Sequence, residues 1–334
     1  MEYMKYGNAG IEVSRLCLGA MTITERLAEN EAIDLVHQCL DGGINFIDTA
    51  DSYGRGESER FLAKALKGRR DQVIISTKVW ASRYAGRRRP ADCSRRHIID
   101  ALNASLERLE TDYVDIYMCH HPDPLTSFEE VYSTLDNLVK QGKIRYVAMC
   151  NAYAWQVAYC LGVCAQHGWE PPVSVQAHYN LLDRSIENET MPMASRLNIV
   201  LQTYGPQSAG LLTGRFRRGE ALPEDTRVAK SGKLSSQLTD EVFDFLEEME
   251  RIAERNGATM AQLAVAWVMS RPAPFVPIVG ASKPEHILPL LSVCELEIAP
   301  EDLDRLTELT EERKYQAFYN QPMSAAPAAA TNWL

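Results

Sequence analysis

Residues 116–150 read IYMCHHPDPLTSFEEVYSTLDNLVKQGKIRYVAMC, and the fold follows from this stretch. Its first apolar run, Ile116–Cys119, has the length of a buried strand. An apolar stripe with helical spacing comes next and consists of Phe128, Val131, Leu135 and Leu138. Gln141-Gly142-Lys143 is a typical helix end, and Ile144–Cys150 predicts a second strand. A strand, a helix and a strand in this order indicate a parallel βα unit.

The same alternation extends along the chain in both directions and yields eight strand candidates. They are Leu16–Leu18, Asn45–Asp48, Val73–Lys78, Ile116–Cys119, Ile144–Cys150, Val173–Gln176, Ile199–Thr203 and Phe275–Val279. We therefore predict an α/β fold, a (β/α)8 TIM barrel with a short N-terminal β-hairpin and extra loops at the C-terminal face. We expect residues 1–320 to form a single barrel domain and residues 321–334 an Ala/Pro-rich C-terminal tail.

The composition of the chain indicates which kinds of molecule it binds. The net charge of -10 and the pI near 5.3 argue against nucleic-acid binding, which needs a basic face, and favour a small-molecule partner. The sequence shows no export signal and no run of apolar residues long enough to enter a membrane. Eight cysteines with irregular spacing predict reduced thiols, and hence a cytoplasmic protein. A monomer is the default expectation.

Polar residues end three consecutive strand candidates. Asp48 ends the second, Lys78 ends the third, and His120 follows the fourth. In a parallel barrel these ends meet at one mouth, and neighbouring strands lie about 4.8 Å apart, so Asp48 and Lys78 are expected to pair. The loop after Asp48 brings Tyr53 above the same mouth. Strand alternation lets only one of His120 and His121 point inward.

This set suggests proton transfer to a carbonyl oxygen. A tyrosine has a pKa of about 10, and we expect the ammonium of Lys78 to lower the pKa of Tyr53 so that it serves as the general acid. Asp48 would keep Lys78 charged, and His120 would align the carbonyl. Each residue taken alone is more often structural, but the four together indicate a catalytic site. Cys119 beside two histidines does not complete four ligands, so no metal is expected.

The sequence resembles the aldo-keto reductase superfamily over roughly residues 4 to 310. The motifs that carry the resemblance are GGINFIDTADSYGRGESER (42–60), VIISTKVW (73–80), LERLETDYVDIYMCHHPDP (106–124), VQAHYNLLDR (175–184) and PIVGASKPEHI (277–287). It implies a catalytic tetrad of Asp48, Tyr53, Lys78 and His120. It also implies NADPH bound in extended form and hydride transfer to an aldehyde or ketone, with alcohol oxidation as the reverse reaction.

The resemblance also implies a set of cofactor contacts. Cys150, Asn151 and Gln176 would hold the nicotinamide carboxamide, and Tyr204 would stack on its ring. The remaining contacts implied are Gly19, Ala20, Met21, Asp48, Gly205, Pro206, Gln207, Gly210, Arg215, Gly280, Ser282, Lys283 and His286. Ser282 and Lys283 match the site for a 2′-phosphate, which favours NADP(H) over NAD(H). Departures from the family pattern are Cys150 for serine, Arg215 for lysine, and Pro289 and Leu290 for Glu-Asn.

Several interpretations stay open at this point. Trp80, Tyr84 and His121 are candidate substrate contacts. The arginine-rich loop 83–96, with Arg87–Arg89, either attracts anionic substrates or is a solvated basic loop. The chain could also be a cofactor-bound regulatory subunit with little turnover, or a lyase that uses Lys78 as a Schiff-base nucleophile. The lyase would need a lysine with a lowered pKa, and Asp48 argues against one.

Overall fold

The computed structural model describes residues 1–79, 82–84, 87–89, 92–226, 228–280 and 283–315. Eight parallel strands close into a barrel in the order β10-β11-β12-β3-β4-β5-β8-β9. Their bounds are β3 Cys17–Gly19, β4 Phe46–Asp48, β5 Ile74–Val79, β8 Val114–Cys119, β9 Ile144–Cys150, β10 Pro172–His178, β11 Val200–Tyr204 and β12 Phe275–Val279. All eight predicted strands are present, and the predicted (β/α)8 barrel is confirmed.

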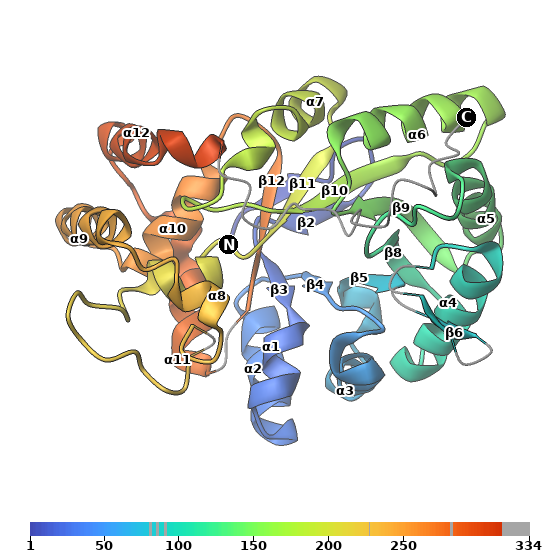
Figure 1. Ribbon diagram of the computed structural model, residues 1–334. Coiled ribbons are helices and arrows are strands. Elements are labelled where there is room, and N and C mark those ends of the chain that lie inside the picture. Colours follow the sequence, from blue (N-terminus) through green and yellow to red (C-terminus); the bar gives the residue numbers. More distant parts are fainter. Residues whose placement is uncertain (80–81, 85–86, 90–91, 227, 281–282, 316–334) are drawn as a thin grey trace.

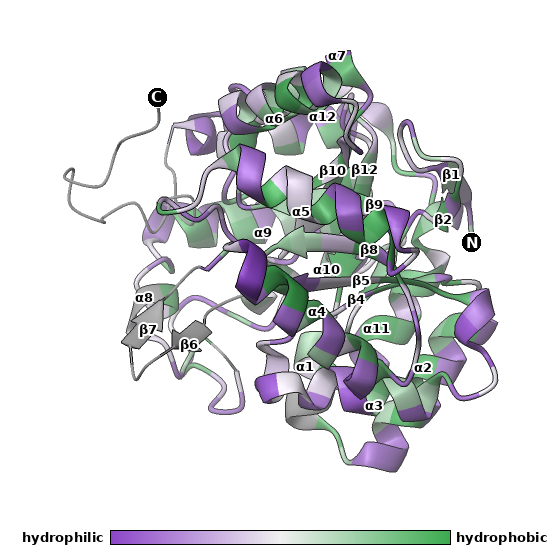
Figure 2. Ribbon diagram, turned by 90° about the vertical axis from the view of Figure 1, so that its right-hand side faces the viewer, coloured by the Kyte–Doolittle hydropathy of each residue, from purple (hydrophilic) through white to green (hydrophobic). Residues whose placement is uncertain are grey.

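Helices surround the strands (Figure 1). The longer ones are α2 Glu29–Asp41, α3 Glu57–Ala65, α4 Arg95–Leu109, α5 Phe128–Lys140, α6 Ala154–His167, α7 Thr190–Leu197, α9 Asp240–Arg255, α10 Met260–Met269 and α12 Pro300–Leu309. Shorter helices are α1 Ala20–Arg26, α8 Gly232–Ser235 and α11 Pro284–Ile287. Figure 2 shows hydrophobic and hydrophilic residues alternating along these helices, as expected where one face packs on the barrel.

Helix α5 shows how the sequence sets these boundaries. The side chain of Ser127 accepts a hydrogen bond from the backbone N–H of Glu130, which caps the first turn. The predicted stripe of Phe128, Val131, Leu135 and Leu138 is buried. The helix ends at Lys140, and Gly142 follows with φ of +74°, a conformation that suits glycine. The predicted helix end is therefore confirmed.

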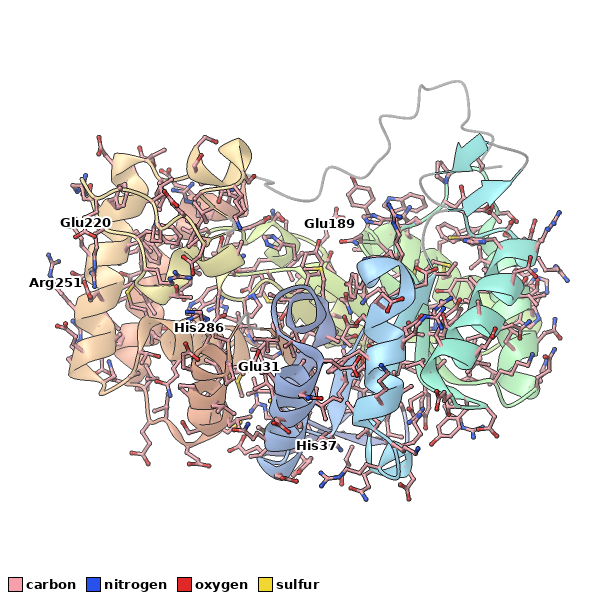
Figure 3. All side chains as sticks on the ribbon, turned by 90° about the horizontal axis from the view of Figure 1, so that it is seen from below. Glu31, His37, Glu189, Glu220, Arg251 and His286 are labelled. Carbon is pink, nitrogen blue, oxygen red and sulfur yellow. The ribbon has the colours of Figure 1, made fainter. Side chains whose placement is uncertain are left out.

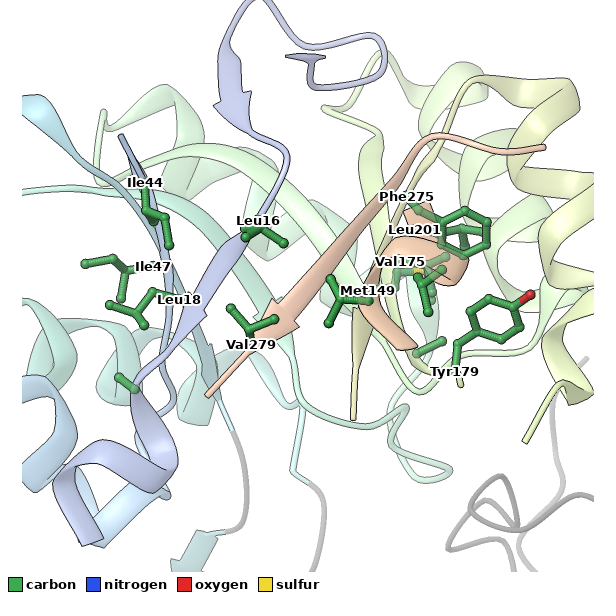
Figure 4. Packing of buried hydrophobic residues seen from close by; sticks show 14 of the residues in the cluster. Leu16, Leu18, Ile44, Ile47, Met149, Val175, Tyr179, Leu201, Phe275 and Val279 are labelled. Atoms are coloured by element: carbon green, nitrogen blue, oxygen red, sulfur yellow. The ribbon is translucent and has the colours of Figure 1, made fainter. Parts of the chain in front are cut away.

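Alternation along the strands divides the core into two parts. Leu18, Ile47 and Val279 face outward and pack with the surrounding helices (Figure 4). Their sequence neighbours Phe46 and Ile278 belong to a separate cluster that fills the barrel. The barrel is a packed core, so a ligand site has to lie at one of its ends.

The N-terminal hairpin closes one of those ends. Strands β1 (Tyr3–Lys5) and β2 (Glu12–Ser14) pair antiparallel, as predicted. Tyr6, from the turn of this hairpin, is fully buried in the inner cluster, and its ring packs edge-on against Phe46 at a centroid distance of 5.5 Å. This floor leaves the carboxyl ends of the strands as the open end.

Two long insertions follow strands at that open end, as predicted. After β5, the strands β6 (Ser82–Tyr84) and β7 (Arg87–Arg89) form an antiparallel hairpin, which projects from the body of the molecule in Figure 3. After β11, residues 205–239 include the 3₁₀ helix η4 (Ser208–Thr213) and α8. Trp80 and the tail 321–334 lie outside the described residues, as does the side chain of Tyr84. Within the described chain, no helix has the length and apolar character to span a membrane.

Candidate active site

Asp48 and Lys78 form a buried ion pair at the ends of β4 and β5. Lys78 Nζ lies 2.6 Å from Asp48 Oδ2, and the two residues are 0% and 3% exposed. Asp48 Oδ1 also accepts hydrogen bonds from Ser76 Oγ at 2.7 Å and from Gln176 Nε2 at 2.8 Å. The predicted pairing is present, and these neighbours satisfy the carboxylate that burial has removed from water.

Tyr53 stands above this pair at the start of the 3₁₀ turn η1 (Tyr53–Gly56). Lys78 Nζ lies 3.3 Å from Tyr53 Oη. A lysine ammonium has donors and no acceptor, so in this contact the phenol accepts and its own O–H can point to another group. The geometry thus leaves the Tyr53 proton available to a ligand in the mouth of the barrel.

The prediction that the pKa of Tyr53 is lowered is wrong, because the sum of all effects raises it. Burial raises the pKa of Tyr53 to about 12, although the charge of Lys78 acts in the lowering direction. Burial disfavours the phenolate more strongly than the nearby ammonium favours it. Tyr53 therefore keeps its proton throughout the neutral range, and the effect of Lys78 is to limit the rise.

Lys78 does not have the lowered pKa that a Schiff-base nucleophile needs. Burial by itself lowers the pKa of Lys78, but the charge of Asp48 and the hydrogen bond with it oppose this effect, and the net pKa is raised above its ordinary value. The lysine remains an ammonium, which has no lone pair with which to attack a carbonyl. This contradicts the lyase interpretation.

His120 and His121 both line the cavity described below, so the prediction that only one points inward is wrong. The ladder between β8 and β9 ends at Cys119, and the alternation rule no longer applies beyond it. The two rings are nearly parallel with centroids 5.6 Å apart, and the His120 ring meets the Tyr53 ring edge-on at 5.8 Å. Asn151 Nδ2 donates to the backbone oxygen of His120 at 3.0 Å.

Both histidines are neutral at pH 7. Burial, and to a lesser extent Lys78 and His121, hold the pKa of His120 well below its ordinary value. Burial lowers the pKa of His121 to about 4. A neutral imidazole can still donate one hydrogen bond, as the orientation of a carbonyl oxygen requires.

A cavity of about 760 Å³ opens beside these residues. Asp48, Tyr53 and His120 line one part of it, and Arg215 and His286 (Figure 3) line another. The other predicted cofactor residues in its wall are Gly19, Met21, Asn151, Gln176, Tyr204, Gly205, Pro206, Gln207, Gly210 and Gly280. The volume lies within the range of roughly 300–1,000 Å³ that is typical of small-molecule and cofactor sites.

Three predicted cofactor residues lie outside the lining of the cavity. Ala20 is fully buried and Cys150 is 1% exposed, and neither lines the cavity. Cys150 Sγ lies 3.6 Å from Gln176 Oε1, so its contact is with another predicted cofactor residue. Lys283 stands outside the lining with its side chain 53% exposed. Ser282 lies outside the described residues.

Three glycines at strand ends lie so close to neighbouring protein atoms that an added Cβ would force those atoms to shift. A Cβ on Gly19 would lie 2.8 Å from Ile278, and one on Gly280 would lie 3.2 Å from the backbone oxygen of Gly19. Gly205 has φ of +69°, and a Cβ there would lie 3.0 Å from the ring of His178. Bare backbone of this kind can approach a long, polar cofactor directly. The residues present therefore fit a dinucleotide.

A chain of polar contacts links Tyr204 and Asn151, the predicted nicotinamide residues, to the histidines. Tyr204 Oη donates to Asn151 Oδ1 at 2.8 Å, and Asn151 holds φ of +53°. Asn151 Nδ2 also lies 3.3 Å from His121 Nε2. The predicted pair Asn151 and Tyr204 thus acts as one unit in the cavity wall, and this unit reaches both histidines.

One ion pair lines the far part of the cavity, and a second lies beside it. Arg215 Nη2 contacts both carboxylate oxygens of Asp225, at 2.8 and 3.1 Å, and Lys283 Nζ lies 3.9 Å from Glu285. Burial lowers the pKa of His286. A bound phosphate would meet these cations together with their carboxylate partners.

Several lining residues were not predicted, among them His178 and Asp225. His178 Nδ1 lies 3.0 Å from Asp183 Oδ2 in a buried pair. His178 follows Gln176 by two residues on the same strand, so strand alternation could have identified it. Asp225 comes from the long loop after β11, where no local pattern marks a residue that folds back.

These features define a class: a (β/α)8-barrel enzyme whose site lies at the carboxyl ends of its strands. No group of three or more His, Cys, Asp or Glu side chains within the described ranges could hold a metal ion. The sequence model of the Aldo/keto reductase family matches residues 15–311.

Individual proteins agree with the family match. The chain is 32% identical to a probable voltage-gated potassium channel subunit beta of Oryza sativa, covering 94% of this chain and 98% of that protein. It is 30% identical to versiconal hemiacetal acetate reductase of Aspergillus parasiticus, covering 92% and 96%. Its structure resembles that of the glycerol dehydrogenase AKR11B4 from Gluconobacter oxydans, with a TM-score of 0.82, 26% identity, and coverage of 93% and 95%.

The chain therefore belongs to the aldo/keto reductase family, and it is an NAD(P)H-dependent oxidoreductase.

The two neutral histidines predict a loss of stability in acid. The unfolded chain binds protons at His120 and His121 below about pH 6.5, whereas the folded chain does not, so the free energy of unfolding should fall as the pH drops from 6.5. Each histidine adds a slope of at most about 1.4 kcal/mol per pH unit, and His121 stops contributing below about pH 4. Urea unfolding of wild type and His121→Asn from pH 7 to 4 measures this. An unchanged slope in the variant would contradict it.

Proposed function

We propose that the protein reduces an aldehyde or ketone with NADPH and that Tyr53 is the general acid. The observation that carries the proposal is that Tyr53, Lys78 and His120 meet at one end of a cavity whose glycine backbone suits a dinucleotide. Bound NADPH would supply a hydride to the carbonyl carbon. Asn151, Gln176 and Tyr204 are the residues that would hold its nicotinamide.

The roles of the residues follow from their contacts. His120 donates a hydrogen bond to the carbonyl oxygen and orients it, since its ring is neutral and faces Tyr53. Tyr53 transfers its proton as negative charge develops on that oxygen. Lys78, held by Asp48 at 2.6 Å, stabilises the phenolate that remains. The buried setting strengthens these interactions, since little water competes for them.

We propose NADPH over NADH because of the far part of the cavity. Arg215 and Lys283 are already paired with Asp225 and Glu285, and both pairs are partly exposed. Exposed pairs of this kind are weak, so a 2′-phosphate can take up their cations at little cost. The assignment of Ser282 and Lys283 to the 2′-phosphate rests on their match to the family motif.

The arginine-rich hairpin supports a preference for anionic carbonyls. The residues that flank the hairpin on both sides lie close to the histidines in the structure. Before the hairpin, the backbone oxygen of Val79 accepts from His120 N at 2.9 Å, and after it, Cys93 N donates to Asp123 at 2.9 Å. The segment between Val79 and Cys93 contains Arg83 and Arg87–Arg89, whereas the protein as a whole is acidic. Cationic charge beside a cavity mouth raises the local concentration of anions.

A regulatory role is the second candidate, since one relative is named as a probable potassium channel subunit. Exposed aromatic side chains on and beside α6, namely Tyr153, Trp155 and Tyr159, offer a surface for a protein partner. We also propose that the protein acts in the cytoplasm as a monomer. The eight cysteines are free, as expected in a reducing compartment.

Tyr53→Phe tests the acid. We expect kcat for the reduction of a carbonyl panel to fall by roughly 100-fold to 10,000-fold, while the Kd of NADPH stays nearly unchanged. Cofactor oxidation followed at its absorbance band measures kcat, and protein fluorescence quenching measures the Kd. An unchanged kcat would refute the assignment. Tight NADPH binding without turnover in wild type would favour the regulatory candidate.

Lys283→Ala tests the cofactor preference. Loss of a charged contact to the 2′-phosphate should raise the KM for NADPH about tenfold and leave the KM for NADH unchanged. Arg251→Ala, an exposed change on α9 (Figure 3), is the control. Equal effects on the two cofactors would show that Lys283 does not read the phosphate.

Replacing Arg87–Arg89 with alanine tests the hairpin. We expect kcat/KM for 4-carboxybenzaldehyde to fall about tenfold at low salt while that for benzaldehyde is retained, and added salt should shrink the difference. The triple variant Lys67→Ala, Arg251→Ala and Arg305→Ala removes the same charge elsewhere as a control. Equal losses of kcat/KM for the two aldehydes would show that the hairpin does not select anionic carbonyls.

A further inference from the structure

Glu59 is a fully buried carboxylate outside the proposed tetrad. It lies in the first turn of α3, on the helix that directly follows Tyr53 and its turn. Glu59 Oε1 accepts from Thr77 Oγ1 at 2.7 Å, and Glu59 Oε2 lies 2.7 Å from Arg108 Nε. An ionised group is almost never fully buried unless it is paired, so its position calls for a reason.

The contact with Thr77 connects Tyr53 to the strand that carries Lys78. Thr77 and Lys78 are adjacent on β5, and alternation sends their side chains to opposite faces of the barrel wall. Lys78 points inward to Tyr53, and Thr77 points outward to Glu59. Helix α3, which follows Tyr53, is therefore bound to the outer face of β5, and the inner face of the same strand carries Lys78, the partner of Tyr53.

Arg108 completes the arrangement from α4. Its side chain lies against Gly56, where a Cβ would come within 2.6 Å of both Cδ and Nε. Gly54, Arg55 and Gly56 all have positive φ, at 58°, 58° and 92°. Such a turn is strained for an L-residue such as Arg55 and persists only where the surroundings determine it. Arg108 covers this turn while its guanidinium is held by Glu59.

A second tie joins the same helix to the neighbouring strand. Ser58 Oγ lies 2.9 Å from Thr49 Oγ1, and the backbone oxygen of Thr49 accepts from Lys78 Nζ at 2.8 Å. Helix α3 is thus connected to the ends of both β4 and β5. The tie through Glu59 is the charged one.

We propose that Glu59, paired with Arg108, is a positioning residue that sets the distance between Tyr53 and Lys78. It does not touch the reacting atoms. It fixes the turn 53–56 against β5, so the phenol stays within reach of the ammonium. The proposal rests on the proposed function, in which Tyr53 donates the proton.

Glu59→Gln is the main test. Glutamine keeps the shape of the side chain and its hydrogen bond to Thr77. Arg108 loses its ionic partner, but its side chain is 16% exposed and can turn to water. The loss of stability should therefore be smaller than on removal of Arg108, which would leave a buried carboxylate unpaired. Misplacement of a reacting group by about 1 Å costs up to roughly 100-fold in rate, and we expect kcat for carbonyl reduction to fall roughly 10- to 100-fold. The Kd of NADPH should stay within about twofold of wild type, since Glu59 does not line the cavity.

Asp115→Asn is the matched control, because Asp115 is a carboxylate of β8 that also contacts β5. Asp115 Oδ2 lies 2.8 Å from Arg70 Nη2 and accepts from Ile75 N at 2.9 Å, so it is an arginine-paired carboxylate that contacts the opposite end of β5 from Lys78. We expect Asp115→Asn to lower Tm but to keep kcat. Gly56→Ala, which pushes Arg108 out of place, should lower kcat as Glu59→Gln does and should also increase the primary isotope effect with deuterated NADPH.

A readout without turnover separates this proposal from the proposed function. With tyrosine labelled at Cζ, the NMR signal of Tyr53, assigned through Tyr53→Phe, should shift in Glu59→Gln and stay in place in Asp115→Asn. If wild type reduces no carbonyl and Glu59→Gln still shifts this signal, the proposed function is overturned and the positioning role is supported. Glu59→Gln with a lowered Tm, normal kcat and an unmoved Tyr53 signal would overturn the positioning role.

Discussion

The ion pair between Lys78 and Asp48 is the interaction on which both barrel and site depend. Removing two such charges from water costs several kcal/mol per ion unless hydrogen bonds replace the lost solvent. Here the replacements come from Ser76 on β5, Gln176 on β10 and the backbone of Thr49. Strands on different sides of the barrel supply these partners, so the pair is satisfied when the barrel has closed.

Burial around this pair decides the protonation states of its neighbours. The pKa of Tyr53 is raised, and the pKa of His120 and of His121 is lowered, so all three are neutral at pH 7 beside a charged Lys78. Each neutral form still carries a proton that it can donate. Beneath this end of the cavity, the barrel is filled by the inner cluster that includes Tyr6 and Phe46.

The two ends of the cavity differ in rigidity. At the end beside Tyr53, Lys78 and Asp48 are almost fully buried and hydrogen-bonded. At the far end, Arg215 is 35% exposed and Lys283 is 53% exposed, and their carboxylate partners are more exposed still. Exposed pairs exchange partners easily, whereas buried ones do not. An oxidoreductase of this family needs an exact geometry where a proton moves and an adaptable one where a nucleotide enters and leaves.

The sequence by itself determined the barrel, its eight strands and the meeting of Asp48, Tyr53, Lys78 and His120, because strand and helix periodicity and strand ends are local signals. Tertiary structure alone decided the rest. It brought His121 into the cavity beside His120, buried Cys150 behind Gln176, folded Asp225 back onto Arg215 and raised the pKa of Tyr53. Each of these depends on how much water is excluded and which distant side chains pack nearby. No periodicity encodes those quantities, since they arise when segments far apart in the chain come into contact.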